Sequence, residues 1–215
     1  MKAIRIIGVL AVAVGIAGAL AGTAAADTPA GEADLGFAHF VKSGTTVDVP
    51  TLARCLVDVT ASGSSGPVVQ AGVAFGGGNG SCTRTVVDPS TDVTSTHSTV
   101  TGQNFELSAL VGAGGPRIKI DSYRLTCDGT PGHTSASWGF SGMSGLPPLP
   151  SPVPAGYTQM IKKADGAVLA TAVFDTITQP GDGSTSMTML TINFAPDSGI
   201  SGSVTVGDTA CAPTP

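Results

Sequence analysis

Glycine, proline and β-branched residues interrupt this chain so often that no long helix is expected after its first 26 residues. Beyond them, no window of about twelve residues keeps the 3.6-residue apolar period free of such breaks. Asp165-Gly166 and Pro180–Gly183 mark two hairpins. Short segments between turn residues predict strands over 35–41, 46–49, 55–60, 68–75, 83–87, 93–100, 105–111, 118–125, 157–162, 167–178, 187–194 and 203–206. The pattern predicts an all-β, antiparallel β-sandwich of the immunoglobulin-like or Greek-key type.

Four segments depart from simple strand alternation. In Ile118–Leu125 the apolar side changes face midway, as at a bulge or a sheet crossing. Gly63–Pro67 is interpreted as a turn and Gly76–Gly80 as a flexible loop. Leu146–Pro154 carries five prolines, so it cannot lie in a central strand and is predicted to be an extended crossing between sheets.

Composition excludes several functional classes. Only 12% of the residues are charged and the net charge is −5, so a basic nucleic-acid-binding surface is not expected. The 41% hydrophobic content argues against disorder. We expect one all-β domain over residues 27–215, or alternatively two subdomains with a boundary near residues 101–104.

The N-terminus has the pattern of a cleavable signal peptide. Lys2 and Arg5 precede the uncharged apolar segment Ile6–Leu20, and Ala24–Ala26 supplies the small residues of a cleavage site. We predict a signal peptide over residues 1–26 and a mature chain that begins at Asp27; a retained membrane anchor is the alternative. The protein is therefore expected to be secreted or extracellular, either free or associated with the cell wall, with no membrane contact after cleavage.

The cysteines agree with export. The chain has four, Cys55, Cys82, Cys127 and Cys211, and none forms a C-x-x-C pair, so zinc-knuckle and thioredoxin motifs are absent. An even number in an exported chain favours two disulfides. Three pairings are possible; we favour Cys55–Cys82 with Cys127–Cys211, because each bridge then stays within one half of the chain.

A search for catalytic chemistry finds little. No G-x-S-x-G elbow occurs, and His39, His97 and His133 lack metal-ligand spacing. The only glutamates are Glu32 and Glu106, and we interpret most aspartates as turn residues. The sequence predicts no catalytic, cofactor-binding or metal-binding residue, and so no enzyme. A histidine that meets an aspartate in space stays open as an alternative.

The aromatic residues beside the proline-rich crossing suggest a binding surface. Trp138, Phe140 and Tyr157 flank this segment, and exposed aromatic rings with polar neighbours are typical of sugar-binding sites. The competing interpretation is that the single tryptophan belongs to the core. We expect a protein or a cell-wall glycan as the partner.

The C-terminal half shows a family resemblance. Its alternating strand into Leu125-Thr126-Cys127, the crossing to Pro154, the Ala164–Gly166 turn before Ala170–Val173, and Gly202–Cys211 resemble exported actinobacterial proteins of the choice-of-anchor P family. The resemblance implies attachment to the cell surface that varies between members, no enzymatic activity, and a Cys127–Cys211 pair.

Together these observations predict an exported, non-catalytic interaction or structural module that acts at or beyond the cell envelope. Two alternatives stay open. One is a secreted hydrolase whose site is assembled from distant residues, and the other is a ligand-binding or protease-inhibitor domain.

Overall fold

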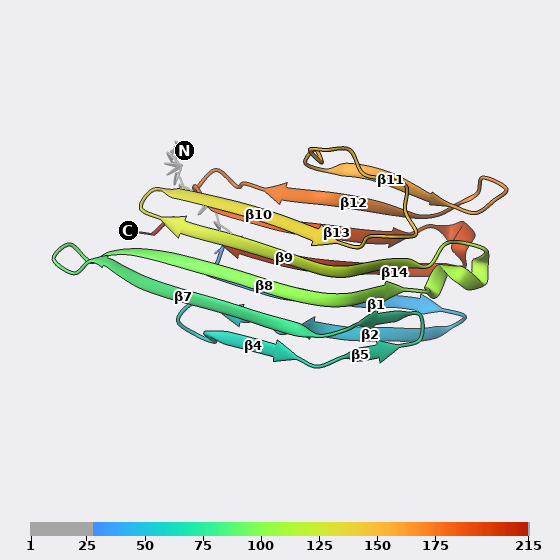
Figure 1. Cartoon of the computed structure of the whole chain (residues 1–215), viewed down its shortest axis with the longest axis horizontal. Helices are drawn as coiled ribbons and strands as arrows, with labels where there is room; N and C mark the ends of the chain where they lie inside the picture. Colours follow the sequence, from blue (N-terminus) through green and yellow to red (C-terminus); the bar gives the residue numbers. More distant parts are fainter. Residues whose placement is uncertain (1–27, 215) are drawn as a thin grey trace, which may run out of the picture.

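Two antiparallel sheets account for most of residues 28–214, the part of the chain that a computed structural model describes (Figure 1). The predicted signal peptide lies outside these residues. Sheet A consists of β1 (Gly31–Lys42), β2 (Thr45–Leu52), β3 (Cys55–Leu56), β11 (Tyr157–Lys162), β12 (Val168–Thr178), β13 (Thr185–Phe194) and β14 (Ile200–Cys211). Sheet B consists of β4 (Ser62–Ser65), β5 (Val68–Gln70), β6 (Val73–Phe75), β7 (Gly78–Asp88), β8 (Val93–Leu107), β9 (Ile118–Thr130) and β10 (His133–Ser141). The 3₁₀ helices are η1 (Ala109–Ala113) and η2 (Pro196–Ser198).

Strand order shows how the chain closes on itself. Sheet A runs β11-β12-β13-β14-β1-β2, with β3 paired to the start of β1. Sheet B runs β10-β9-β8, and β8 pairs with β7 over most of its length and with β6 at its end. Sheet A is therefore built from both ends of the described chain, and sheet B from its middle. Residues 101–104 lie within β8, which pairs with β7 on one side and β9 on the other.

The core lies between the sheets. Apolar side chains from both inner faces form one buried cluster, whose largest fully buried members include Phe40, Phe75, Phe105, Phe174 and Leu125. Removing this apolar surface from water is the main stabilising contribution, because the hydrophobic effect scales with buried area. The all-β sandwich predicted from the sequence is confirmed.

Two disulfides join the sheets. Cys55 in β3 is bonded to Cys82 in β7, and Cys127 in β9 is bonded to Cys211 in β14. Each bridge thus connects sheet A to sheet B across the core, and all four cysteines are buried. The favoured pairing is confirmed.

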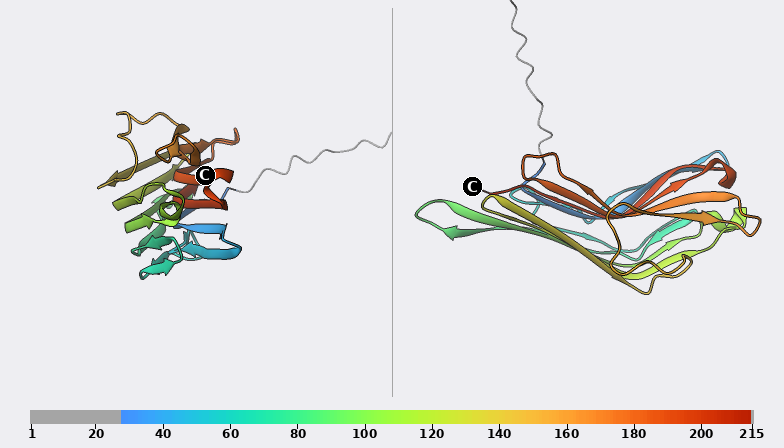
Figure 2. Two further views of the ribbon diagram at one scale, coloured as in Figure 1. Left: turned by 90° about the vertical axis from the view of Figure 1, so that its right-hand side faces the viewer. Right: turned by 90° about the horizontal axis from the view of Figure 1, so that it is seen from above.

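Both sheets bend about halfway along their strands (Figure 2). The buried side of β9 changes from Ile118 and Ile120 to Tyr123 and Leu125, which confirms the predicted change of face. β9 nevertheless keeps one register with β8 and β10, so the cause is a bend and not an inserted residue. At this level Asn104 in β8 has a left-handed backbone (φ 51°).

In sheet A, residues at the same position along the strands also have a left-handed backbone conformation. Asp175 in β12 has a φ of 53°, and Gly207 in β14 has a φ of 69°. Gly36 in β1 has a φ of 120°, and a Cβ there would lie 2.2 Å from the Thr205 carbonyl oxygen. The bend therefore requires glycine at this position of β1.

Some local predictions were wrong. Residues 133–141, where no strand was predicted, form β10, and the predicted turn at Gly63–Pro67 contains most of β4. The predicted flexible loop Gly76–Gly80 contains the start of β7. β8 is one strand where two were expected, and the chain enters η1 at Ala109. Serine and glycine have low strand propensity, but pairing with neighbouring strands overrides it here.

Candidate functional site

The predicted aromatic surface is assembled only in part. Trp138 and Phe140 are two residues apart in β10, so their side chains lie on the same face of the sheet. Their rings stack with centroids 5.8 Å apart and an interplanar angle of 18°. Trp138 is half-buried and packs on the core, whereas Phe140 is 36% exposed. Tyr157 instead contacts Phe174 of the adjacent strand β12, with ring centroids 6.4 Å apart.

The proline-rich crossing covers the end of β10, where Phe140 lies. Phe140 lines a cavity of about 250 Å³ together with apolar residues of the crossing: Met143, Leu146, Pro147, Pro148 and Leu149. The side-chain amide of Gln159 in β11 donates a hydrogen bond to the Pro147 carbonyl, 3.4 Å away. This segment, residues 143–149, is called the crossover wall below. Its cavity offers apolar contact and no titratable group.

A larger cavity lies on the other side of the crossover wall. Its volume is about 580 Å³, and its lining residues are Gly114, Gly115, Pro116, Gly145, Leu146, Pro147, Met160, Ile161 and Lys162. The two cavities share Leu146 and Pro147. Met160 is 59% exposed, so its side chain is available for apolar contact with a ligand.

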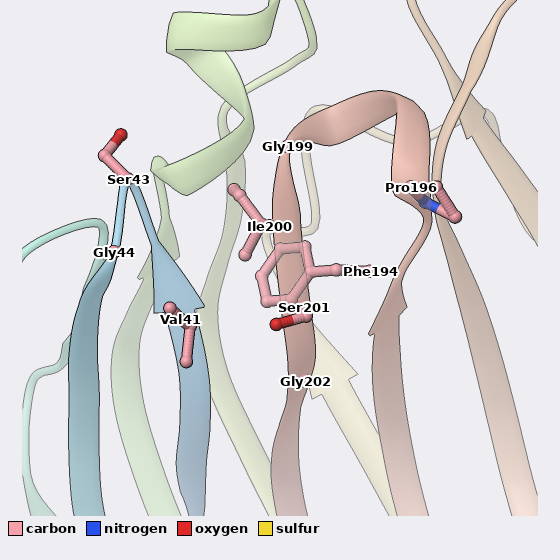
Figure 3. A pocket seen from close by; sticks show the side chains of 9 residues that line it. All are labelled: Val41, Ser43, Gly44, Phe194, Pro196, Gly199, Ile200, Ser201 and Gly202. Carbon is pink, nitrogen blue, oxygen red and sulfur yellow. The ribbon is translucent and has the colours of Figure 1, made fainter.

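A third cavity lies at the same end of sheet A, where two turns meet (Figure 3). It has a volume of about 450 Å³ and is lined by Val41, Ser43, Gly44, Phe194, Pro196, Gly199, Ile200, Ser201 and Gly202. No titratable side chain is among these residues, so this cavity offers no group for proton transfer.

Two histidines meet aspartates, as the sequence left open. His39 Nδ1 lies 3.0 Å from Asp48 Oδ1 across β1 and β2, and His97 Nδ1 lies 2.6 Å from Asp128 Oδ1 across β8 and β9. Each pair is a direct cross-strand neighbour on an outer sheet face, with both side chains more than 40% exposed. Such exposed pairs contribute little to stability, and neither lies in a cavity described above.

The third histidine lies apart from these pairs. His133 begins β10 and lines a cavity of about 350 Å³ with Gly132, Thr134, Gln179, Gly181, Gly183 and Ser184. It makes no ion pair within residues 28–214. In the described part of the chain, no carboxylate is therefore paired with the His133 ring.

Two carboxylates with raised pKa values were not anticipated from the sequence. Asp34 in β1 and Asp208 in β14 are direct cross-strand neighbours, and Asp34 is 6% exposed. Burial, followed by the Asp208 charge, raises the pKa of Asp34 to about 7, although the Gly36 N–H donates a 2.8 Å hydrogen bond to it. Burial also raises the pKa of Asp208 to about 6, with a further contribution from Glu32.

Neighbouring polar groups enclose this pair. Glu32 forms an ion pair with Arg54, and the Thr188 hydroxyl donates to Asp208 at 3.4 Å. The Tyr123 hydroxyl donates to the Leu35 carbonyl at 2.8 Å, and burial raises the pKa of its phenol. One feature of the sequence could have pointed to Asp34. It stands between Ala33 and Leu35 in an apolar segment, and not among the turn residues that surround most of the other aspartates.

Comparisons with known proteins add no assignment: no family model, no curated protein and no solved structure matches the chain. Within residues 28–214, no helix is long and apolar enough to cross a membrane. The same residues contain no group of three or more histidine, cysteine, aspartate or glutamate side chains that could hold a metal ion.

Proposed function

We propose that the protein is an exported, non-catalytic binding module that acts at or beyond the cell envelope. The observation that carries this proposal is the stacked Trp138–Phe140 pair beside an apolar cavity at the edge of sheet B. Stacked aromatic rings with one exposed member offer a large, rigid contact area to a sugar ring or an apolar side chain.

Other features support export. Two inter-sheet disulfides fit an oxidising compartment outside the cytosol. The leader pattern of residues 1–26 and the resemblance to the choice-of-anchor P family point the same way, toward an actinobacterial envelope protein. The partner that we propose is a cell-wall glycan, because the exposed Phe140 ring of the stack can lie against the apolar face of a sugar ring.

Co-sedimentation with purified insoluble cell-wall glycan tests the proposal. The wild-type protein should sediment with the glycan, and Phe140→Ala should weaken this binding about tenfold because the exposed ring of the stack is lost. Val69→Ala, which removes a 74% exposed side chain from the distant strand β5, is the matched control and should bind normally. Equal binding of both variants would contradict the assignment of glycan binding to the Trp138–Phe140 surface. Capture of an envelope protein in place of glycan would assign the surface to a protein partner.

A hydrolase is the second candidate, and Asp34–Asp208 is the observation that favours it. Paired carboxylates with separated, raised pKa values are typical of acid–base catalysis. Asp34 is nevertheless buried, and neither carboxylate lines a cavity described above. Hydrolysis of a glycan or peptide that disappears in Asp34→Asn, with the fold retained, would establish this function and overturn the non-catalytic proposal.

A further inference from the structure

The cavity behind the crossover wall combines apolar sides with cationic surroundings. Leu146, Pro147, Met160 and Ile161 supply its apolar surface, and the glycines beside Pro116 leave it open. Its volume of about 580 Å³ is in the range of small-molecule sites, which are mostly apolar with a few polar groups. Because Leu146 and Pro147 also line the neighbouring cavity, apolar surface continues past the wall toward Phe140. An elongated apolar chain matches this shape better than a compact ligand does.

Charge around the cavity distinguishes it from the rest of an acidic protein. Arg117 and Lys119 follow Pro116, Lys162 ends β11 and Lys163 comes directly after it, so four of the chain's ten basic residues lie on or next to the segments that line the cavity. Two carboxylates partly neutralise them. Glu106 pairs with both cations of β9, and Asp165 lies 3.1 Å from the Lys163 ammonium.

Lys162 is the cation that belongs to the cavity itself. It lines the cavity directly and makes no ion pair within residues 28–214. Its side chain lies on the same outward face of β11 as Met160, two residues earlier. An unpaired ammonium beside an exposed apolar side chain is complementary to a ligand with an anionic head and an apolar tail.

Two backbone hydrogen bonds of 3.0 Å between Ser144 and Lys119 fasten the crossover wall to β9, and a side-chain hydrogen bond joins it to β11. Its hydrogen bond to β11 is the 3.4 Å contact from Gln159 to Pro147, and the Gln159 Oε1 atom is buried with no partner in the described part of the chain. Methionine side chains on both sides, Met143 and Met160, can adjust to ligands of different shape. Rearrangement of these two side chains can therefore admit an apolar chain while the backbone of the wall stays in place.

We propose that this cavity binds a single-chain anionic amphiphile, with the apolar chain along Leu146, Pro147 and Met160 and the anionic head at Lys162. The site shares Leu146 and Pro147 with the cavity beside Phe140, but neither Trp138 nor Phe140 lines it, so it does not depend on glycan binding. It would give the protein a second ligand class, fatty-acid-like molecules in the free, monomeric state.

Titration of the mature protein with decanoate tests the proposal, with acetate as the head alone and decan-1-ol as the uncharged chain. Isothermal titration should show saturable one-to-one binding of decanoate below the concentration at which it self-associates. Amide NMR shifts should change at residues 114, 115, 145, 146 and 160–162, which carry the backbone N–H groups of the lining. Acetate should not bind, and decanol should bind about fivefold more weakly than decanoate because it lacks the contact with Lys162.

Matched variants separate the two parts of the site. Lys162→Gln should weaken decanoate about fivefold and leave decanol unchanged, whereas Met160→Gln should weaken both. The control variants are Lys42→Gln for the charge and Val69→Gln for the apolar side chain. Neither residue lines the cavity, so both variants should bind decanoate and decanol as the wild type does. Lys162→Gln should also leave glycan co-sedimentation intact, so failure of one proposal is distinguishable from failure of the other.

Three results would overturn the inference. One is the absence of saturable decanoate binding, and another is an equal loss of affinity in Lys42→Gln. The third is binding to phosphatidylglycerol vesicles with no binding of monomeric decanoate, which would assign this end of the sandwich to a membrane surface.

Discussion

At the scale of single residues, Asp34 and Asp208 lie across the pairing of the first and last strands, where two ionised carboxylates would repel each other. Their raised pKa values let the pair hold a proton at mildly acidic pH. The native protein consequently binds more protons than the unfolded chain between about pH 4 and pH 7, because both unfolded carboxyls titrate near pH 4. Folding stability should therefore fall as the pH rises through this window.

We expect the free energy of unfolding to decrease by on the order of 3 kcal/mol between pH 4.5 and pH 8. Asp34→Asn keeps an acceptor for the Gly36 N–H and removes the charge, so it should stabilise the protein at pH 8 and flatten the pH dependence. Urea unfolding at several pH values measures both effects. Asp92→Asn, at an exposed position whose left-handed backbone suits asparagine, is the control. A slope unchanged by Asp34→Asn would refute the assignment.

Gly36 supports a second prediction at the residue scale. Gly36→Ala should destabilise the fold by about 3 kcal/mol or more, because the new methyl group meets the Thr205 carbonyl at a backbone conformation that alanine avoids. Gly112→Ala is the matched control, since a Cβ at Gly112 meets nothing within 4 Å. Thermal unfolding should separate the two variants by many degrees, and similar melting temperatures would show that the bend tolerates a side chain.

At the scale of elements, the disulfides fasten strands of one sheet to strands of the other. The Cys127–Cys211 bridge closes a sequence separation of 84 residues and the Cys55–Cys82 bridge one of 27. A longer loop restricts the unfolded chain more strongly. The bridge at the last strand should therefore be the more stabilising of the two.

The double variant Cys127→Ala/Cys211→Ala should lose about 4 kcal/mol of stability, and Cys55→Ala/Cys82→Ala about 3 kcal/mol. Chemical denaturation of the purified double variants measures these losses, and non-reducing peptide mapping of the wild type verifies the pairing. A larger loss from the shorter bridge would mean that native packing around Cys55 and Cys82, and not loop length, determines the contribution of each bridge.

Element-scale features also explain which predictions succeeded. Strands such as 118–125 and 187–194 were predictable because apolar residues recur at every second position on each side of the point where the buried face changes. β10 was not, because its Ser, Gly and Thr content resembles a loop, and only pairing with β9 makes it a strand. The Trp138–Phe140 stack follows from their i, i+2 spacing once β10 exists. The Asp34–Asp208 pair joins residues 174 positions apart, and no local pattern encodes such a register.

At the scale of the whole molecule, closure depends on contacts between distant parts of the sequence. β1 can complete sheet A only when β14 pairs with it, and every strand of sheet B lies between them in the chain. Such long-range pairing is slow, because the entropy of closing a long loop is lost before the contacts form. A covalent bridge from β14 to sheet B holds the late-pairing strand near its place, which connects disulfide formation to completion of the fold.

This dependence gives the last prediction, which concerns the exported protein. We expect the mature chain to begin at Asp27 and to contain no free thiol, since oxidation would follow removal of the leader and export from the reducing cytosol. N-terminal sequencing, together with intact mass before and after alkylation, measures both properties in one sample. Protein retained in the cytosol by deletion of residues 2–26 is the control, and it should carry reduced cysteines and unfold at lower denaturant concentration. A secreted form that begins at Met1, or a leaderless cytosolic form that is as stable as the exported one, would contradict the link between export, oxidation and the closed sandwich.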